Sequence, residues 1–302
     1  MSSMFKECHS LEKIEFTNFN TETVTDMSSM FNRCIALKEL DLSNFKTDKV
    51  TDMSYIFYKC EKLKSLNLSN FNTQNVINMS NMFYECYYLE NINLSNFDTN
   101  KVNNMNNMFY FCKSLKNLDL SNFYTPNLKD MNLLFYNCSS LRNINISNFN
   151  TDNIKDMSCM FYNCSNINYL DLSNFSTDNV INLSNMFYNC KSLKEINISN
   201  FNTNNVTDMH HMFCYCSSLK KINLSNFNTN NVTNMKSMFY GCTSLEFIDV
   251  SHFNIDNVKD MSYMFYSCIS LRDINLFKIE KEKETNLEYM FYRCNIKIKG
   301  FI

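Results

Sequence analysis

Cysteine and histidine are the residues whose types and spacing most directly suggest chemistry in this chain. The 302 residues include 14 cysteines and 4 histidines. In the run Met209-His-His-Met-Phe-Cys214, His210 and Cys214 are four residues apart, which places two side chains on one face of a helix. Imidazole and thiolate ligands suit zinc. His210, His211 and Cys214 are therefore a candidate metal site, although neutral variation on an exposed helix is the preferred interpretation because no fourth ligand is evident.

The other cysteines follow a strict period. Phenylalanine recurs every 26 residues from Phe5 to Phe291, and a cysteine follows three residues after each, from Cys8 to Cys294. A period held in phase over the whole chain indicates a stacked repeat array, or solenoid. An unbroken ladder of this kind selects no disulfide partners. Because it lies in phase with the apolar residues, it predicts reduced thiols that pack in the core like small hydrophobic side chains.

A single repeat predicts two elements. Leu40 and Leu42 alternate with polar residues, which indicates a short strand, and Ser43-Asn44 is a turn signal. The apolar residues that follow are spaced by three, three, one and three, which predicts about two turns of helix with Thr47 or Thr51 as the N-cap. These residues are Val50, Met53, Ile56, Phe57 and Cys60.

The stacking of such units predicts the architecture. Parallel strands pack about 4.8 Å apart and helices about 8–10 Å apart, so the strands should lie on the inside of an arc. We expect an α/β solenoid, a horseshoe of about eleven to twelve repeats with a parallel concave β-sheet and short convex α-helices. Residues 1–278 form the solenoid. Residues 279–302, which lose the repeat pattern in a charged stretch, are predicted to be a degenerate capping repeat of the same domain.

The repeat also resembles a known family. Units such as Leu170-Asp-Leu-Ser-Asn-Phe175 and Thr207-Asp-Met-His-His-Met-Phe213 are similar to those of BspA-like leucine-rich-repeat surface proteins. The resemblance covers residues 1–278 and implies a cell-surface or secreted protein with a role in adhesion and host contact, without enzymatic activity. The segment Met1-Ser-Ser-Met-Phe5 lacks the features of a signal peptide, so a cytoplasmic location is the alternative.

Composition excludes several classes of function. The two glycines, Gly241 and Gly300, are too few and too far apart for a nucleotide-binding glycine loop. A net charge of −2 provides no basic field for nucleic acid, and no apolar run reaches the length of a membrane span. None of the histidines lies in a catalytic motif. We therefore expect neither an enzyme nor a cofactor.

The predicted concave face is the best candidate for function. The residues at the start of each strand vary between repeats, and variable side chains on a regular platform are how solenoids bind ligands. The predicted ligand-binding residues are Lys116, Asn117, Arg142, Asn143, Tyr169, Lys194, Glu195, Lys220 and Lys221. They suggest a monomer that binds a protein or glycan, extracellular or on a host, whereas the alternative is a structural or intracellular scaffold that mediates protein–protein interaction.

Tyrosine forms a second stripe. In nine repeats a tyrosine directly follows the periodic phenylalanine, as in Tyr58 and Tyr84. Such a stripe could bind a partner, since tyrosine is enriched at interfaces. The preferred interpretation is structural, with rings that cover the seams between repeats and hydroxyl groups that remain in water.

Overall fold

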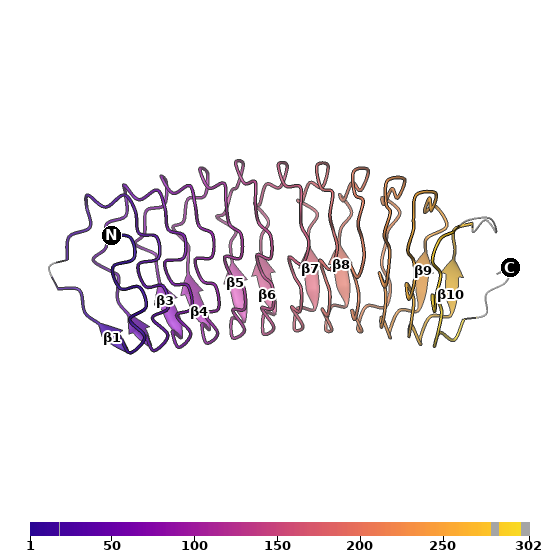
Figure 1. Cartoon of the computed structure of the whole chain (residues 1–302), viewed down its shortest axis with the longest axis horizontal. Coiled ribbons are helices and arrows are strands. Elements are labelled where there is room, and N and C mark those ends of the chain that lie inside the picture. The colour runs from indigo at the N-terminus through magenta and orange to yellow at the C-terminus, as the bar shows by residue number, and fades with distance from the viewer. Residues whose placement is uncertain (18, 279–283, 297–302) are drawn as a thin grey trace. The chain divides into compact units, whose positions relative to one another are not determined.

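A computed structural model describes residues 1–17, 19–278 and 284–296 of the chain. The chain divides into two compact units, Met1–Asn153 and Ile154–Ile302. Each unit is a solenoid of 26-residue coils, and its strands take the same place in successive coils (Figure 1). The 26-residue period of the sequence continues without a shift across the boundary between the units. The single domain that the sequence suggests stays a prediction.

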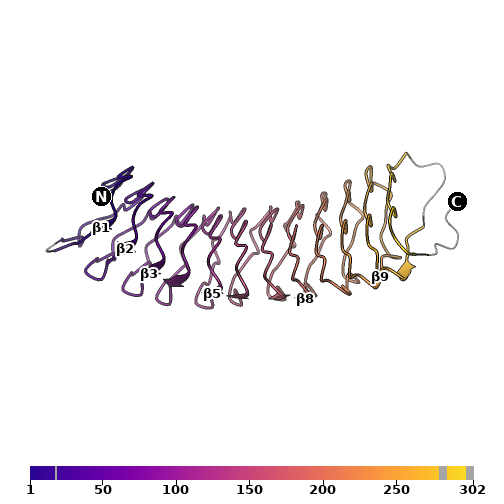
Figure 2. The same ribbon diagram turned by 90° about the horizontal axis from the view of Figure 1, so that it is seen from below.

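The strands are short and parallel, and Figure 2 shows them on one side of the coils in each unit. The first unit contains β1 (Lys13–Ile14), β2 (Glu39–Leu40), β3 (Ser65–Asn67), β4 (Asn91–Asn93), β5 (Asn117–Asp119) and β6 (Asn143–Asn145). The second contains β7 (Tyr169–Asp171), β8 (Glu195–Asn197), β9 (Phe247–Asp249) and β10 (Asp273–Asn275). Each strand pairs with a neighbour 26 residues away, such as Leu66 opposite Ile92.

The predicted continuous sheet is wrong. The described strands form five two-stranded sheets, β1–β2, β3–β4, β5–β6, β7–β8 and β9–β10. The segment 221–223, which has the phase of a strand, is not one. Within the three-residue strands the middle residue points inward, as Leu118 does in β5, and its two neighbours are exposed, except for the half-buried Asn197 of β8. This is the alternation that the sequence predicts, but it is confined to pairs of repeats.

The predicted convex helices are also wrong, because no helix occurs in the described residues. In the segment Met53–Cys60 three linked turns replace the helix, and the N–H groups of Ile56, Tyr58 and Cys60 each bond to the carbonyl three residues earlier. Two residues in this segment, Tyr55 (φ 57°) and Lys59 (φ 57°), are left-handed. A backbone with these angles cannot form an α-helix.

The remaining N–H groups of this turn segment join one coil to the next. Those of Met53, Tyr55, Phe57 and Lys59 donate to carbonyls of the following repeat at 2.7 to 3.1 Å. Parallel bridges add to this ladder, from Asp26 to Asp130 in the first unit and from Asp156 to Asn286 in the second. Every neighbouring pair of coils along these bridges is connected. We call this side of the coil the turn side, and the opposite side, which holds the strands, the strand side.

Ring spacings differ between the two sides of the coil. In the first unit, centroids of stacked tyrosines on the turn side lie 4.5 to 4.8 Å apart, those of the Phe31 series 5.4 to 5.8 Å, and those of Phe97, Phe123 and Phe149 6.1 Å. In the second unit Tyr162–Tyr188 and Phe201–Phe227 are 4.5 and 6.5 Å apart. The strand side is therefore the wider side of the coil. Its ring spacing does not select the paired gaps, because the rings of Phe97 and Phe123, beside the unpaired β4 and β5, and those of Phe123 and Phe149, beside the paired β5 and β6, are both 6.1 Å apart.

This gradient is the reverse of the one on which the predicted concave sheet depended. The coils are closest together where helices were expected, because linked turns are as thin as strands. The strands were expected on the inside of an arc only because helices on the other side would be wider. Since linked turns replace the helices, this reason is gone. We therefore refer to the exposed side chains of the strand side as the strand face, without a curvature.

The core explains the repeat. Phenylalanine, methionine, leucine and cysteine of successive coils are buried in register, and Phe57, Met53 and Cys60 have no exposed surface. A row of buried threonines also connects the coils. Thr47 Oγ1 donates to the carbonyl of Asn72 at 2.9 Å and accepts from its N–H at 2.8 Å. Thr47 is thus part of an inter-repeat ladder and not the N-cap of a helix.

The predicted capping repeat is described only in part. Residues 279–283 and 297–302 lie outside the described residues. In the described part, Asn286 continues the bridges of the turn side, and the ring of Phe291 stacks on that of Phe265 at 5.4 Å. This segment extends the turn side by one more coil.

Candidate binding face

The strand face is built from three positions in each repeat: the residue before the strand and the first and third residues of the strand. At the third position stands an aspartate or asparagine whose Oδ1 accepts a backbone N–H two residues later. Asp119 accepts from Ser121 at 3.0 Å, and Asn67 accepts from Ser69 at 3.1 Å. These side chains close the turn after the strand, so the third position is constant for a structural reason.

The first position and the residue before it are free of that role and vary. All nine residues predicted to bind a ligand are exposed. Asn117, Asn143, Tyr169 and Glu195 are first residues of strands, Lys116, Arg142 and Lys194 precede strands, and Lys220 and Lys221 lie in the equivalent segment that is not a strand. Four of the nine, those up to Asn143, belong to the first unit, and the other five belong to the second.

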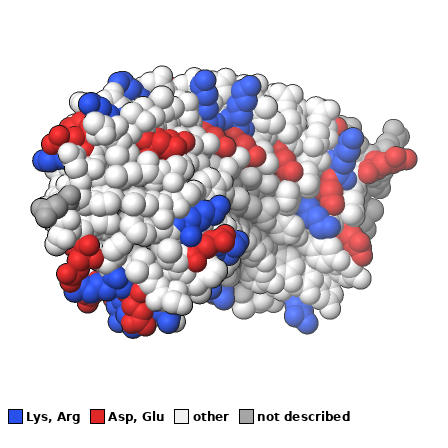
Figure 3. Space-filling model, turned by 60° about the vertical axis from the view of Figure 1, so that its left-hand side comes forward, with Lys and Arg blue, Asp and Glu red and all other residues white. Residues whose placement is uncertain are grey.

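Ion pairs connect some of these residues to a neighbouring repeat. Lys116 lies 3.7 Å from Glu90, and Lys220 lies 3.7 Å from Glu246. Such exposed pairs contribute about 0–1 kcal/mol. Among the described residues, Arg142 and Lys194 have no carboxylate within ion-pair distance. Figure 3 shows acidic and basic side chains on one face of the molecule, and some of opposite charge lie next to one another.

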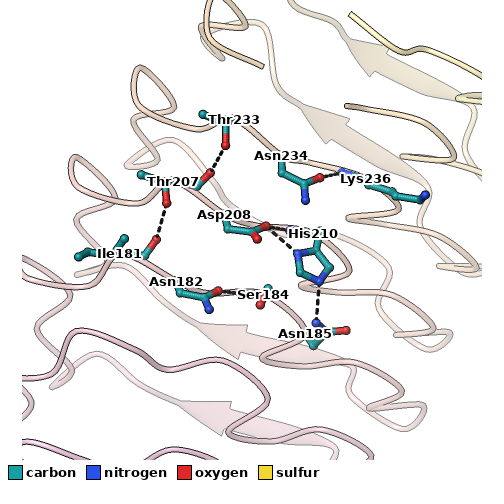
Figure 4. A network of polar contacts seen from close by, with 10 residues as sticks. All are labelled: Ile181, Asn182, Ser184, Asn185, Thr207, Asp208, His210, Thr233, Asn234 and Lys236. Carbon is teal, nitrogen blue, oxygen red and sulfur yellow. Dashed lines mark hydrogen bonds and ion pairs between the residues drawn. The ribbon is translucent and has the colours of Figure 1, made fainter. Parts of the chain in front are cut away.

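The histidine and cysteine candidates for metal binding belong to the turn segment of one repeat of the second unit, and Figure 4 shows His210 with its polar neighbours. His210 Nδ1 lies 2.7 Å from Asp208 Oδ1, and His210 Nε2 lies 3.1 Å from Asn185 Nδ2, so both ring nitrogens are engaged by the chain. Cys214 is buried, and burial raises its pKa. The described part of the chain contains no group of three or more His, Cys, Asp or Glu side chains arranged to hold a metal ion.

Cys214 belongs instead to a local substitution that involves a glycine. It stands where other repeats have tyrosine, and the ring of the next residue, Tyr215, packs against Tyr188 and Tyr240 at 5.8 and 5.1 Å. The Tyr215 ring covers Gly241, where a Cβ would lie 2.8 Å from Tyr215 Cδ1. Gly241 has φ +70° and occupies a left-handed position of the turn segment. This glycine therefore makes room for the displaced aromatic ring.

The cysteine ladder is confirmed as part of the core for ten of its twelve members, whereas Cys8 is exposed and Cys294 is half-buried, and all fourteen cysteines are free. Ladder thiols reach back one repeat, as Cys60 Sγ donates to the carbonyl of Phe31 at 3.2 Å and Cys242 Sγ to that of Phe213 at 3.1 Å. Burial raises the pKa of Cys242 to about 12, so the thiol stays protonated and can donate. A small apolar residue with a weak donor fits this position.

The tyrosine stripe has its ring faces covered. Tyr84 stacks between Tyr58 and Tyr110 with centroids 4.6 and 4.5 Å apart, and Tyr240 stacks on Tyr266 at 4.7 Å. The rings of Tyr58, Tyr84, Tyr110 and Tyr240 are each covered by the tyrosine ring of the next coil. The stripe therefore fills the seams of the turn side, which supports its structural interpretation.

Proteins similar to this chain occur among solved structures but not among curated proteins. In the described residues no helix has the length and apolar character needed to cross a membrane. No curated protein matches the chain. Among solved structures, a leucine rich cell surface protein of Faecalibacterium prausnitzii A2-165 is similar at 18% identity and a TM-score of 0.49, over 93% of this chain and 76% of that one. A leucine-rich repeat protein of Bacteroides ovatus is similar at 20% identity and a TM-score of 0.46, over 92% and 76%.

A family model identifies the chain more directly. Its matches cover residues 1–123, 110–197 and 183–300, and thus nearly the whole sequence. The chain belongs to the family described as Mycoplasma protein of unknown function, DUF285.

Proposed function

We propose that this protein is a non-enzymatic binding module that recognises a protein or glycan through its strand face. The observation that supports this function is the division of roles within each repeat. Core, threonine, cysteine and third-position residues are engaged between coils or in turns. The first strand position and the residue before it are exposed and differ from repeat to repeat. Variable side chains on a rigid repeat platform are suited to specific binding.

The two units present different chemistry on their strand faces. In the first unit Asn117 and Asn143 form a carboxamide row, joined by a hydrogen bond of 2.6 Å, beside the unpaired Arg142. In the second, Tyr169 is 51% exposed and lies opposite Glu195 in the register of β7 and β8. Its ring stacks on no other described ring. Exposed tyrosine and arginine side chains are the types that contribute most to interfaces.

The remaining features of the proposal rest on the sequence resemblance. BspA-like repeats imply a location at a cell surface or in the extracellular medium, and a partner on a host or in the matrix. The proposed module acts as a monomer by many modest contacts. It needs no cofactor, because binding through surface side chains requires none.

Arrays of glycans and of purified matrix proteins test this function. One variant replaces Lys116 and Arg142 of the first unit by serine, and a second replaces Lys194 and Lys220 of the second unit. A charge-matched control carries Lys129→Ser and Lys155→Ser, at exposed positions next to the bridges of the turn side. All variants are checked for unchanged thermal unfolding.

The proposal predicts saturable binding that at least one strand-face variant weakens about tenfold, while the control leaves it unchanged. Loss in the first or second variant identifies the unit that binds. Binding that is equally strong in all variants, or equally weakened by the control, would contradict recognition through the strand face. Absence of binding to every array would favour the scaffold alternative.

A further inference from the structure

The first unit has a hollow on its strand side that lies apart from the nine predicted residues. Its volume is about 760 Å³, within the range of about 300–1,000 Å³ typical of ligand sites. It lies over the coils that carry β1, β2 and β3. Its walls are formed by two stretches, 13–17 and 39–44, together with Ser65, Asn67, Ser69 and Asn70.

The hollow combines an apolar base with polar walls. Ile14 and Leu40, the inward residues of β1 and β2, are half-buried, as Ile92 of β4 and Ile144 of β6 also are. Both Ile14 and Leu40 belong to the lining of the hollow. Around it lie hydroxyl and carboxamide groups, including those of Ser65 and Asn67. An aliphatic chain with a polar end fits such a surface.

Carboxylates determine which polar end fits. The lining contains one cation, Lys13, and it is already paired with Glu15 at 2.9 Å. Glu39 and Asp41 project from the same strand segment, and neither has a cation within ion-pair distance among the described residues. The backbone N–H of Ser43 lowers the pKa of Asp41, which keeps this carboxylate ionised at neutral pH. Among the described residues, the lining thus has two carboxylates, Glu39 and Asp41, that lack a cation at ion-pair distance.

We propose that this hollow binds an arginine or lysine side chain of a partner protein. The guanidinium or ammonium group lies between Glu39 and Asp41, and its methylene stem covers Leu40 and Ile14. Arginine is the better fit, because its planar fork can donate to both carboxylates at once. A metal ion is a poorer occupant, since the described residues hold no group of three His, Cys, Asp or Glu side chains suited to one.

This site rests on the proposed function only in sharing the strand face, and its residues are separate from the nine. The probe is a fluorescent Gly-Arg-Gly-Arg-Gly peptide, compared with the same peptide in which citrulline replaces arginine. Citrulline has a similar shape but no charge. Binding to the full chain is measured by fluorescence anisotropy at low and at physiological salt.

The variant for the site is the double substitution Glu39→Gln, Asp41→Asn. Asparagine occupies the position of Asp41 in other repeats, at Asn67 and Asn93, where it still accepts the turn N–H at 3.1 Å. The fold therefore tolerates the change. The control is Glu90→Gln, Asp119→Asn, which removes the same charge from the strand face of the same unit outside the hollow.

The proposal predicts that the arginine peptide binds about tenfold more weakly to the site variant than to the parent or the control, because two exposed charge contacts are lost. Citrulline should weaken binding similarly in the parent. Equal binding of both peptides, or equal loss in both variants, would overturn the site. Loss confined to the Lys116, Arg142 variant would overturn it as well, while supporting the proposed function.

Discussion

The turn side and the strand side of each coil are stabilised in different ways. On the turn side, backbone N–H groups of successive coils within each unit bond to the next coil, tyrosine rings stack face to face, and thiols donate to carbonyls. On the strand side, backbone ladders form only within pairs of repeats, and the side chains at the strand starts mostly face water. The comparison shows that stability and variability are separated within one 26-residue unit. The turn side provides the stability, and the strand side is free to vary.

Alkaline pH should produce the largest effect on the turn side. Burial raises the pKa of the Cys138, Cys190 and Cys242 thiols to about 12, above the value of about 9 expected in the unfolded chain. Above pH ~9 the folded state holds protons that the unfolded state releases, so stability falls by about 1.4 kcal/mol per pH unit for each thiol. We expect the free energy of unfolding to be flat from pH 7 to ~8.5 and to fall steeply from pH ~9 to ~10.5.

Urea unfolding at a series of pH values measures this loss. Cys242→Ala is the matched control and should reduce the slope by one proton, in proportion to the number of thiols that remain. A free energy of unfolding that stays constant to pH ~10.5 would show that the ladder thiols are not buried as described.

Truncation of a turn-side ring should produce the next largest effect. Phe83 has no exposed surface and stacks between Phe57 and Phe109 at 5.6 and 5.4 Å. Phe83→Ala removes both contacts and leaves a cavity, so we expect a loss of about 3–5 kcal/mol in urea unfolding. A loss below ~1 kcal/mol would mean that the phenylalanine series is loosely packed.

Gly241 tests whether the displaced Tyr215 ring depends on it. Gly241→Ala places a methyl group against Tyr215 and forces alanine into a left-handed conformation, which should cost about 2 kcal/mol. Tyr215→Asn reproduces the residue of the preceding repeat, Asn189, and removes the clash. In the double variant the alanine should cost about 1 kcal/mol less than in the parent, as a double-mutant cycle measures. Additive effects would show that the two residues do not interact.

The threonine row should contribute less per residue. Thr73 Oγ1 donates to the carbonyl of Asp98 at 2.8 Å and accepts from its N–H at 2.7 Å. Thr73→Val keeps the shape but removes both bonds, with an expected loss of about 1–2 kcal/mol. Thr25→Val is a control at an exposed threonine of the same unit, and equal losses in the two variants would contradict the inter-repeat role of Thr73.

Strand-face substitutions should have the smallest effect on stability. Lys116→Ser and Asn117→Ser change exposed side chains, so we expect shifts below about 0.5 kcal/mol by thermal unfolding. A loss above ~1 kcal/mol would show that these residues stabilise the fold. They would then be poor candidates for a variable binding surface.

The sequence was sufficient to predict the repeat and its inward residues. The 26-residue phase of Phe57 and Cys60 places these side chains on the same side of every coil, and both are buried. It was not sufficient to exclude a helix, because linked turns with a three-residue period bury the same positions. The sequence nonetheless contains a signal for the left-handed residues of these turns. Asn137, Asn163 and Asn189, with Gly241 further along the same row, are residue types that favour the left-handed conformation.

Other features depend on distances that no single repeat encodes. Strands pair at some gaps between repeats and not at others, although every repeat carries the same alternating pattern. The nine strand-face residues were predicted to be exposed from alternation alone, and they are, but their role in binding stays a prediction. The hollow beside Glu39 was missed because its depth depends on how far Leu40 is covered by neighbouring coils.

Native-state hydrogen exchange in the first unit tests most directly whether the turn side holds the coils together. The N–H groups of Tyr55, Phe57 and Lys59 bond to the next coil at 2.7 to 3.1 Å. The N–H of Lys116, at the seam between β4 and β5, has no backbone acceptor within the described residues. The structure predicts that the three turn-side amides exchange only with the free energy of global unfolding, whereas the amide of Lys116 exchanges through small local openings. Turn-side amides that exchange as readily as that of Lys116 would contradict it.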